Sequence, residues 1–308
     1  MQKSRVYFAM LIAILAVSTA SIFIRQAQQD APSIVIAAVR LSLASLVLAP
    51  FALHKYRGEI RSLTRRDWIL ATISGLFLSI HFATWITSLE YTTVVSSVVL
   101  VSTGPLWVAL LSPIFLREIP SRWVWIGMGF ALLGGIIVSL GGTCAISNSQ
   151  LACPPLIGRE SDSTLLGNFL ALLGAWAVAV YLMIGRNLRA RINLIPYIFI
   201  VYSIAAIMLN IYMLAAGESP IGYPPTTYLW MLCLALLPQL IGHSTYNWAL
   251  RYMPASLVAV TTLGEPIGST ILAFFLLRES PSVVTLIGGV LILIGIYIST
   301  LTPSANKR

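Results

Sequence analysis

Two charged residues stand near the middle of long apolar segments of this sequence. Arg40 interrupts segment 33–53, and Glu265 interrupts segment 256–277. If these segments span a membrane, each charge costs roughly 2.5–3.5 kcal/mol at the bilayer centre on insertion scales. A group of that cost is expected to face a bundle interior or a water-filled cavity. There it binds a ligand, or it braces the bundle as a structural ion pair, and we take both residues as candidate binding residues.

Two further segments carry histidine and aromatic residues at helical spacing. Segment 68–89 places polar and aromatic residues at positions i, i+3, i+4 and i+7: His81, Thr84, Trp85 and Ser88. Segment 227–250 has a similar group: His243, Tyr246 and Asn247. Residues at this spacing share one helical face. We expect the two faces to form opposite walls of one cavity, although packing alone is the commoner reason for such a pattern.

Weaker candidates for the same cavity share helical faces with other polar or small residues: Ser96, Thr103, Trp107 and Tyr181. Pro105 and Pro266 lie in the middle of segments 94–116 and 256–277. Proline removes a backbone donor and clashes with the preceding turn, so each is expected to kink its helix. A kink that differs between two conformations would make these prolines gating residues, and a static kink is the alternative. The sequence has no metal-ligand spacing and no HExxH motif, so it predicts neither a metal site nor a cofactor.

The elements that must position these residues are membrane-spanning helices. Hydrophobic residues make up 58% of the 308 residues and charged residues 9%, against roughly 45–50% and about 25% in soluble domains. A spanning helix needs roughly 20 mostly apolar residues. Ten segments meet this need: 6–25, 33–53, 68–89, 94–116, 123–141, 164–184, 195–216, 227–250, 256–277 and 283–301. The predicted fold is an all-α integral membrane protein with ten transmembrane helices in a lipid bilayer.

The basic residues are divided unequally between the loops. With the N-terminus in the cytoplasm, most Lys and Arg residues fall on the cytoplasmic side, whereas Arg25, Arg159 and Arg278 fall outside. This is the distribution of the positive-inside rule. It predicts cytoplasmic N- and C-termini in a bacterial inner (plasma) membrane. It also accounts for the net charge of +9 without nucleic-acid binding.

Two cysteines, Cys144 and Cys153, share the longest outer loop, residues 142–163. An extracytoplasmic compartment is oxidising enough for them to form a disulfide. Their spacing does not establish this bond, so the pair is a disulfide candidate.

The chain repeats itself at an offset of 161 residues. Leu116-Arg117-Glu118-Ile119-Pro120-Ser121 matches Leu277-Arg278-Glu279-Ser280-Pro281-Ser282, and Pro105 matches Pro266. Each half would hold five helices, and because five is odd the second half must insert upside down. Such inverted repeats are a recurring architecture of secondary transporters. We predict one five-helix repeat in residues 1–141, an extracytoplasmic loop in 142–163 and a second repeat in 164–308.

The repeated motif resembles that of a known family. The pattern Pro105…Leu116-Arg117-Glu118-x-Pro120…Gly127 and its echo Glu265-Pro266…Leu277-Arg278-Glu279-x-Pro281…Gly288 are similar to the EamA type of the drug/metabolite transporter superfamily. The resemblance covers nearly the whole chain except the 142–163 loop and the tails. It implies a central cavity among the first, third, fourth, sixth, eighth and ninth helices. It also implies export of amino acids or other metabolites, while more distant branches carry nucleotide sugars or sugar phosphates.

The sequence therefore predicts a secondary transporter, expected to export a small amphipathic metabolite such as an amino acid. One alternative is a membrane-embedded enzyme that uses His81, His243 and Glu265 in acid–base chemistry, but no nucleophile–base pair is recognisable. Another is a transporter of nucleotide sugars or sugar phosphates, which would need more than one intramembrane cation, and Arg40 stands alone. No GxxxxGK[ST] motif occurs, so the chain does not itself use ATP. The oligomeric state is left open.

Glu265 has two possible roles in such a transporter. Its sequence neighbours carry no charge, and a carboxyl desolvated in such surroundings favours its neutral form. It could then exchange protons and couple substrate movement to a proton gradient. An ion pair with Arg40 would instead hold it ionised, to orient a substrate amine or brace the bundle. The sequence leaves both roles open.

Overall fold

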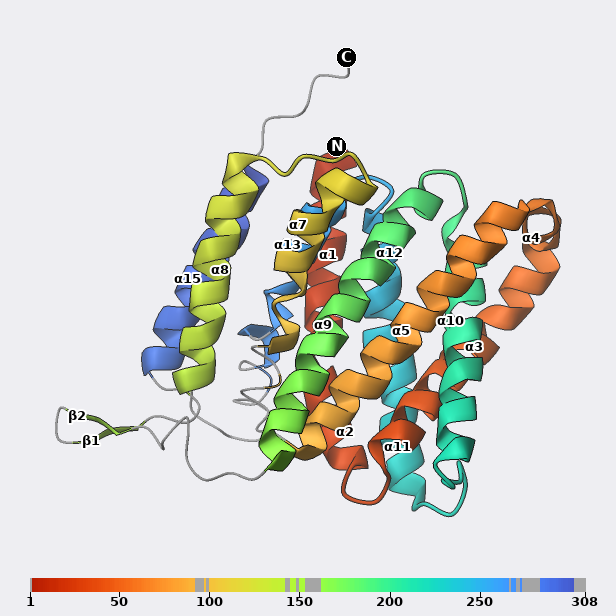
Figure 1. Ribbon diagram of the computed structural model, residues 1–308, viewed down its shortest axis with the longest axis horizontal. Coiled ribbons are helices and arrows are strands. Elements are labelled where there is room, and N and C mark those ends of the chain that lie inside the picture. Colours follow the sequence, from red (N-terminus) through yellow and green to blue (C-terminus); the bar gives the residue numbers. More distant parts are fainter. Residues whose placement is uncertain are drawn as a thin grey trace.

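The computed structural model of the chain describes residues 2–91, 97, 100–141, 145–147, 150–152, 162–265, 267–269, 272 and 283–301. Its helices stand alongside one another in one bundle (Figure 1). They are α1 (Gln2–Ser18), α2 (Ala20–Ala27), α3 (Ser33–Lys55), α4 (Arg57–Ser62), α5 (Arg65–Tyr91), α7 (Gly104–Phe115), α8 (Arg122–Gly141), α9 (Asp162–Arg189), α10 (Leu194–Ala215), α11 (Pro225–Leu234), the π-helix η1 (Ala235–His243), α12 (Ser244–Ala249), α13 (Ala255–Thr262) and α15 (Val283–Thr300).

Six helical stretches of the described residues are long and apolar enough to cross a membrane: 4–27, 33–55, 65–91, 165–189, 194–215 and 225–249. The helical membrane fold is therefore confirmed, whereas the count of ten spans stays a prediction. The 142–163 loop adds an element that the all-α prediction lacked. Strands β1 (Ala145–Ser147) and β2 (Gln150–Ala152) pair there as an antiparallel hairpin. Cys144, Cys153 and their predicted bond lie outside the described residues.

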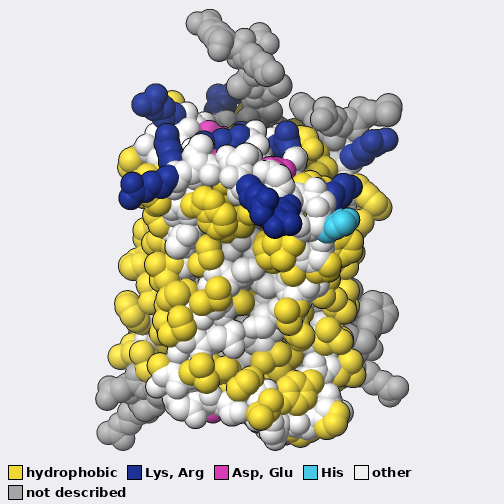
Figure 2. Space-filling model, turned by 90° about the vertical axis from the view of Figure 1, so that its right-hand side faces the viewer, with side chains coloured by type: hydrophobic (Ala, Val, Ile, Leu, Met, Phe, Trp, Pro, Cys, Tyr) yellow, Lys and Arg dark blue, Asp and Glu magenta, His cyan; other side chains and the backbone are white. Residues whose placement is uncertain are grey.

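The outer surface between the two ends is largely apolar, and a few strongly polar side chains lie in the otherwise hydrophobic interior. Leu46, Ile114 and Leu165 are 68–71% exposed, whereas Arg40 and Gln239 are fully buried. Hydrophobic side chains cover much of the flank shown in Figure 2, and Lys and Arg side chains gather at one end. That end carries the N-terminus (Figure 1), and we call it the basic end. Such a surface suits contact with lipid, and the chain is an integral membrane protein.

Several interior serine and threonine hydroxyl groups donate to carbonyl oxygens of their own helix. Ser18, Thr84 and Ser112 donate to carbonyl oxygens four residues earlier, at 2.6–2.8 Å. Ser79 and Ser88 donate to carbonyls three residues earlier, each at 2.7 Å. Such bonds let a small polar side chain sit inside an apolar bundle without an unpaired donor. The buried polar groups that remain unpaired therefore stand out.

Helices α8 and α15 pack through glycines related by the 161-residue offset. A Cβ atom on Gly127 would collide with the backbone of Gly295, and one on Gly134 would lie 2.5 Å from the carbonyl oxygen of Gly288. The order of the contacts is reversed along the two helices, so they run antiparallel. Small residues allow this close backbone approach, as in other membrane helix pairs.

We expect Gly134→Ala to destabilise the α8–α15 pair. The added Cβ would lie within 3.0 Å of backbone atoms of Gly288 and Ile292, and overpacking of this kind costs about 1–3 kcal/mol. The matched control is Gly129→Ala in the same helix, where nothing lies within 4 Å of the new atom. Thermal unfolding in detergent should show a lower Tm only for the Gly134 variant. Equal Tm values for both variants would contradict this packing.

The other contacts between the two halves also occur in matched sets. Helix α5 packs against α9, and at the offset positions η1 packs against α1. The offset relates α3 to α10, and these two helices pack against each other, as α8 and α15 do. The contacts between the two halves therefore occur in pairs that are related by the 161-residue offset.

Both helices that carry the mid-segment prolines are broken beside them. A turn at Ser102–Thr103 precedes α7, and a turn at Leu263–Gly264 follows α13. These turns are 161 residues apart, so the break is part of the repeat. Pro105 lies in the first turn of α7, where a missing N–H costs nothing. The predicted mid-helix kink at Pro105 is thus corrected to a helix start after a break, and Pro266 lies outside the described residues.

The predicted segment 227–250 is a single rod of α11, η1 and α12 with a π-helical centre. Pro238 lies inside η1, and its ring and missing N–H are incompatible with regular α-helical bonding. A π-helix widens the turn and accommodates such a residue, and π segments are frequent at functional sites. This wider turn brings Gln239 and His243 toward the bundle interior.

Candidate functional site

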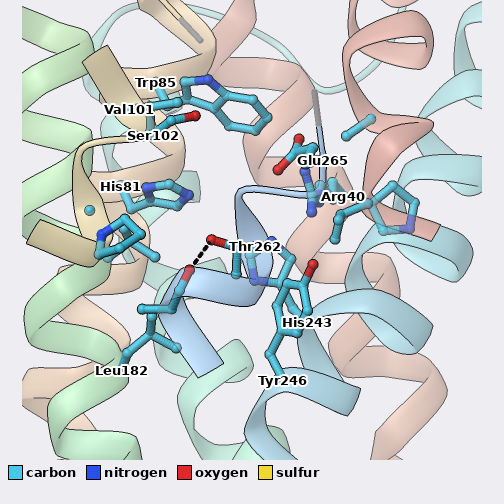
Figure 3. A pocket seen from close by; sticks show the side chains of 17 residues that line it. Arg40, His81, Trp85, Val101, Ser102, Leu182, His243, Tyr246, Thr262 and Glu265 are labelled. Atoms are coloured by element: carbon cyan, nitrogen blue, oxygen red, sulfur yellow. Dashed lines mark hydrogen bonds between the residues drawn. The ribbon is translucent and has the colours of Figure 1, made fainter. Parts of the chain in front are cut away.

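A cavity lies in the bundle interior, between elements of both halves (Figure 3). The centres of water-sized spheres can occupy about 80 Å³ of it, which is room for on the order of five waters or one small solute. Its lining comes from α1, α2, α3, α5, α7, α9, η1, α12, α13 and the two breaks: Val17, Ala20, Arg40, His81, Trp85, Val101, Ser102, Gly104, Pro105, Val178, Leu182, Pro238, His243, Tyr246, Ala259, Thr262 and Glu265.

The structure brings most of the predicted site residues together. The predicted residues that line the cavity are Arg40, His81, Trp85, Pro105, His243, Tyr246 and Glu265. The remaining described candidates lie elsewhere: Thr103, Trp107, Tyr181 and Asn247. Ser96 and Pro266 fall outside the described residues. The predicted meeting of the two histidine faces is therefore seen at this cavity.

Arg40 is held firmly, yet its outer edge has no partner. Its Nε donates to Oε1 of Gln239 at 3.1 Å, and its guanidinium carbon lies 4.2 Å above the ring centre of Phe82. The side chain is fully buried. Both terminal nitrogens, Nη1 and Nη2, lack a hydrogen-bond partner in the described structure. The alternative role as a structural ion pair is not seen among the described residues, because no nitrogen of Arg40 lies within 4.0 Å of an oxygen of Glu265.

Glu265 begins the helical turn after the break at Leu263–Gly264. Its backbone carbonyl accepts a bond from Ser18 at 3.1 Å, which ties it to α1. Its carboxylate makes no hydrogen bond or ion pair with the described residues, and it lines the same cavity as Arg40. Figure 3 shows Glu265 and Arg40 on one side of the cavity and His81 and Leu182 on the other. The cavity therefore carries one charge of each sign.

Aromatic rings form another part of the cavity wall. His81 stacks on Trp85 with ring centres 5.8 Å apart, and His243 lies 6.4 Å from His81. Nδ1 of His81 lies 2.9 Å from the carbonyl oxygen of Gly174. The lack of a side chain at Gly174 lets α9 approach α5, since a Cβ there would meet Thr84 at 3.2 Å. No hydrogen bond joins either histidine to the other or to Glu265 among the described residues.

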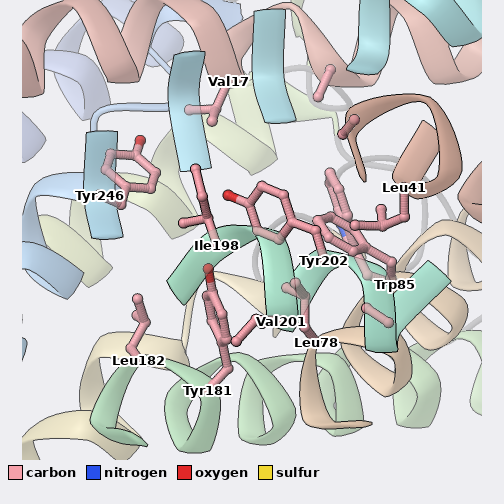
Figure 4. Packing of buried hydrophobic residues seen from close by; sticks show 14 of the residues in the cluster. Val17, Leu41, Leu78, Trp85, Tyr181, Leu182, Ile198, Val201, Tyr202 and Tyr246 are labelled. Carbon is pink, nitrogen blue, oxygen red and sulfur yellow. The ribbon is translucent and has the colours of Figure 1, made fainter. Parts of the chain in front are cut away.

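The predicted candidates outside the cavity have structural contacts. Tyr181 is bonded to the side chain of Asn247, and it sits in the apolar core beside Tyr202 and Leu182 (Figure 4). Trp107 donates to the hydroxyl of Thr103 at 3.3 Å and meets Trp176 edge to face. These four residues therefore lie outside the cavity lining in this conformation.

Several lining residues that the sequence reasoning missed are repeat mates of each other or of recognised ones. The 161-residue offset relates four pairs in the wall: Val17 with Val178, Trp85 with Tyr246, Val101 with Thr262, and Gly104 with Glu265. Applying the offset to each candidate would have found Gly104. Gln239 gave no such signal, because its role depends on the π-helix.

A polar cluster ties several helices together at the basic end. The αL conformation of Arg117, with φ of 55°, ends α7 and turns the chain toward α9 and α13. Oε1 of Glu118 accepts from Arg186 at 2.6 Å, and Oε2 accepts from the backbone N–H of Ala255 at 3.3 Å. Arg186 also donates to the carbonyl of Leu250 at 2.6 Å. These three links join the ends of α7, α9 and α12 to the start of α13 at the basic end.

Comparison with known proteins identifies the family. A model of the EamA-like transporter family matches the chain twice, at residues 4–140 and 165–301. The chain belongs to the EamA-like transporter family. The second match begins 161 residues after the first, the offset at which the sequence repeats itself.

Relatives of this EamA-like chain are named as transporters. An uncharacterized transporter of Archaeoglobus fulgidus is 23% identical over 97% of this chain and 98% of its own. The uncharacterized transporter YetK of Bacillus subtilis is 24% identical over 85% of this chain and 77% of its own. One crystal structure shares the fold with a TM-score of 0.76, at 19% identity over 97% of both chains. Family and relatives indicate a transporter rather than an enzyme.

Proposed function

We propose that this EamA-like protein is a secondary transporter that exports a small amphipathic metabolite, such as an amino acid. The observation that carries the proposal is the cavity itself. It lies at the meeting of the two repeats and holds one buried cation, one carboxylate and an aromatic wall. A zwitterion with an apolar side chain is complementary to this lining in charge and in polarity.

The matched architecture supports alternating access between inverted repeats. The glycine contacts of α8 with α15 and the equivalent breaks beside α7 and α13 suit two halves that exchange conformations around a fixed site. The cluster at Glu118 would then close the cavity toward the basic end in the conformation described here. The ten-span topology, with both termini in the cytoplasm of a bacterial inner membrane, belongs to the same proposal.

The alternative functions fit the cavity less well. An acid–base enzyme needs a base within hydrogen-bond reach of a reacting group, and the described lining offers no paired nucleophile and base. A sugar-phosphate carrier would carry about two negative charges to the site. Arg40 is the only Lys or Arg residue among the described residues that line the cavity.

The direct test is flux in liposomes containing the purified protein. We expect exchange of radiolabelled apolar amino acids, such as leucine, across vesicles that are preloaded with the same amino acid. Liposomes without protein provide the baseline. If the vesicles exchanged sugar phosphates but no amino acid or amphipathic drug, the proposed substrate class would be wrong.

Thiol labelling tests the topology. We expect Cys144 and Cys153 to react with a membrane-impermeant maleimide added outside whole cells only after reduction, because an oxidised pair has no free thiol. Cys233, a free and half-buried cysteine of α11, is removed beforehand as Cys233→Ala. Labelling from the cytoplasmic side alone would contradict the proposed orientation. Labelling from outside without reduction would show that the two cysteines do not form a disulfide.

A further inference from the structure

The unpaired polar atoms of the cavity wall are mostly hydrogen-bond donors. Nη1 and Nη2 of Arg40, Nε1 of Trp85 and the hydroxyl of Tyr246 are buried and have no partner in the described structure. All three residues line the cavity. A buried donor without an acceptor costs about 1–3 kcal/mol, and more when it is charged. A wall of this kind is therefore built for a ligand that brings acceptors.

The geometry around Arg40 specifies which acceptor fits. Gln239 occupies Nε and Phe82 covers one face of the guanidinium, so the free edge is the one formed by Nη1 and Nη2. Two parallel N–H groups match the two oxygens of a carboxylate. The carboxylate of Glu265 does not fill this edge, although it lies in the same cavity.

We infer that the Nη1–Nη2 edge of Arg40 is a carboxylate subsite and that the substrate is bound as a zwitterion. This inference rests on the proposed transport function and adds the orientation of the substrate. The carboxylate of the substrate pairs with Arg40, and its amine faces Glu265. Its apolar side chain points toward Trp85, Val178 and Leu182.

Arg40 and Glu265 are both paired only when the substrate carries a carboxylate and an amine. A substrate that lacks its carboxylate leaves Arg40 buried without a partner, and one that lacks its amine does the same to Glu265. Removing one partner of a buried charged hydrogen bond costs more than removing both. The cavity is therefore expected to bind a molecule that lacks either charged group more weakly than the zwitterion.

The test is ligand-induced thermal stabilisation of the purified full chain in detergent, which does not depend on transport. The probes are leucine, leucinamide without the carboxylate, and 4-methylpentanoate without the amine. We expect leucine to stabilise the protein and each analogue to bind at least about tenfold more weakly, as the loss of one charge-assisted bond implies.

Two variants then test the assignment of each charge. Arg40→Lys keeps the charge but loses the two parallel N–H donors, so leucine should bind about tenfold more weakly. Leucine should still bind more tightly than 4-methylpentanoate. Glu265→Gln should reduce the preference for leucine over 4-methylpentanoate and leave the preference over leucinamide. Because the analogues also report on the unaltered protein, a variant that fails to fold does not remove the test.

The possible outcomes separate this inference from the proposed function. Equal stabilisation by leucine and leucinamide would overturn the carboxylate subsite, as would unchanged leucine binding in Arg40→Lys. Liposome flux of amphipathic amines without carboxylates would also overturn the subsite while leaving transport intact. Absence of flux for every solute would instead contradict the proposed function.

Discussion

Glu265→Gln is expected to abolish pH-driven accumulation of substrate, while exchange at equal pH continues but needs a higher leucine concentration because the amine has lost its charged partner. The carboxylate lies in the cavity without a partner among the described residues, so it is free to take up and release a proton as the cavity changes sides. With one proton per substrate, a gradient of one pH unit supports accumulation of about tenfold. The glutamine variant keeps the shape of the side chain and cannot titrate, so its accumulation ratio should fall to about one.

The measurement uses proteoliposomes with an imposed pH gradient and a clamped membrane potential. Glu218→Gln is the matched control, because this residue lies in the loop between α10 and α11, away from the cavity. Loss of exchange even at saturating leucine, together with loss of accumulation, would mean that Glu265 acts in substrate binding alone and not in proton coupling. Normal flux with a full pH response in a correctly inserted variant would show that the carboxylate has no functional role.

Glu118→Gln is expected to open the cavity more often toward the basic end. The substitution removes the ion pair with Arg186 and weakens the bond to the N–H of Ala255. The ion pair is partly exposed, with 25% of each side chain accessible. We therefore expect its loss to destabilise the closed conformation relative to the open one by about 0.5–1.5 kcal/mol. That corresponds to a change of about two- to tenfold in the ratio of the two conformations.

A reporter thiol in the cavity wall measures this shift. Thr262→Cys, in a background without other cysteines, should react about two- to tenfold faster from the basic end when Glu118→Gln is also present. Glu59→Gln is a control at the same end, since Glu59 contacts Asn193 and not the helices that carry the cluster. An unchanged labelling rate would mean that the Glu118 cluster is only an anchor.

The helical membrane fold was predictable because its signals are local. Long apolar segments and sparse charge specify lipid-facing helices, and the matching motifs around Glu118 and Pro105 reveal the repeat. Arg40 and Glu265 were predictable for the same reason, since a charge within a spanning segment has few places to lie.

Other parts of the site depend on information that the helical pattern lacks. The breaks beside Pro105 and Glu265 move these residues from a helix interior to a helix start, and proline alone does not distinguish a kink from a break. The π-helix places Gln239 against Arg40, which α-helical spacing does not predict. Tyr181 and Asn247 shared helical faces with cavity residues but bond to each other, because side-chain pairing inside a bundle depends on tertiary contacts.

Alternate opening of one cavity, bounded by both repeats, to the two sides of the membrane is the core of the proposed transport mechanism. Its most direct test is labelling of Thr262→Cys by an impermeant reagent added to each side of sealed vesicles. We predict reaction from both sides, slowed by leucine on either side, and no reaction at Val258→Cys, a fully buried position of the same helix that does not line the cavity. Reaction from one side only, in vesicles that still exchange leucine, would contradict the account.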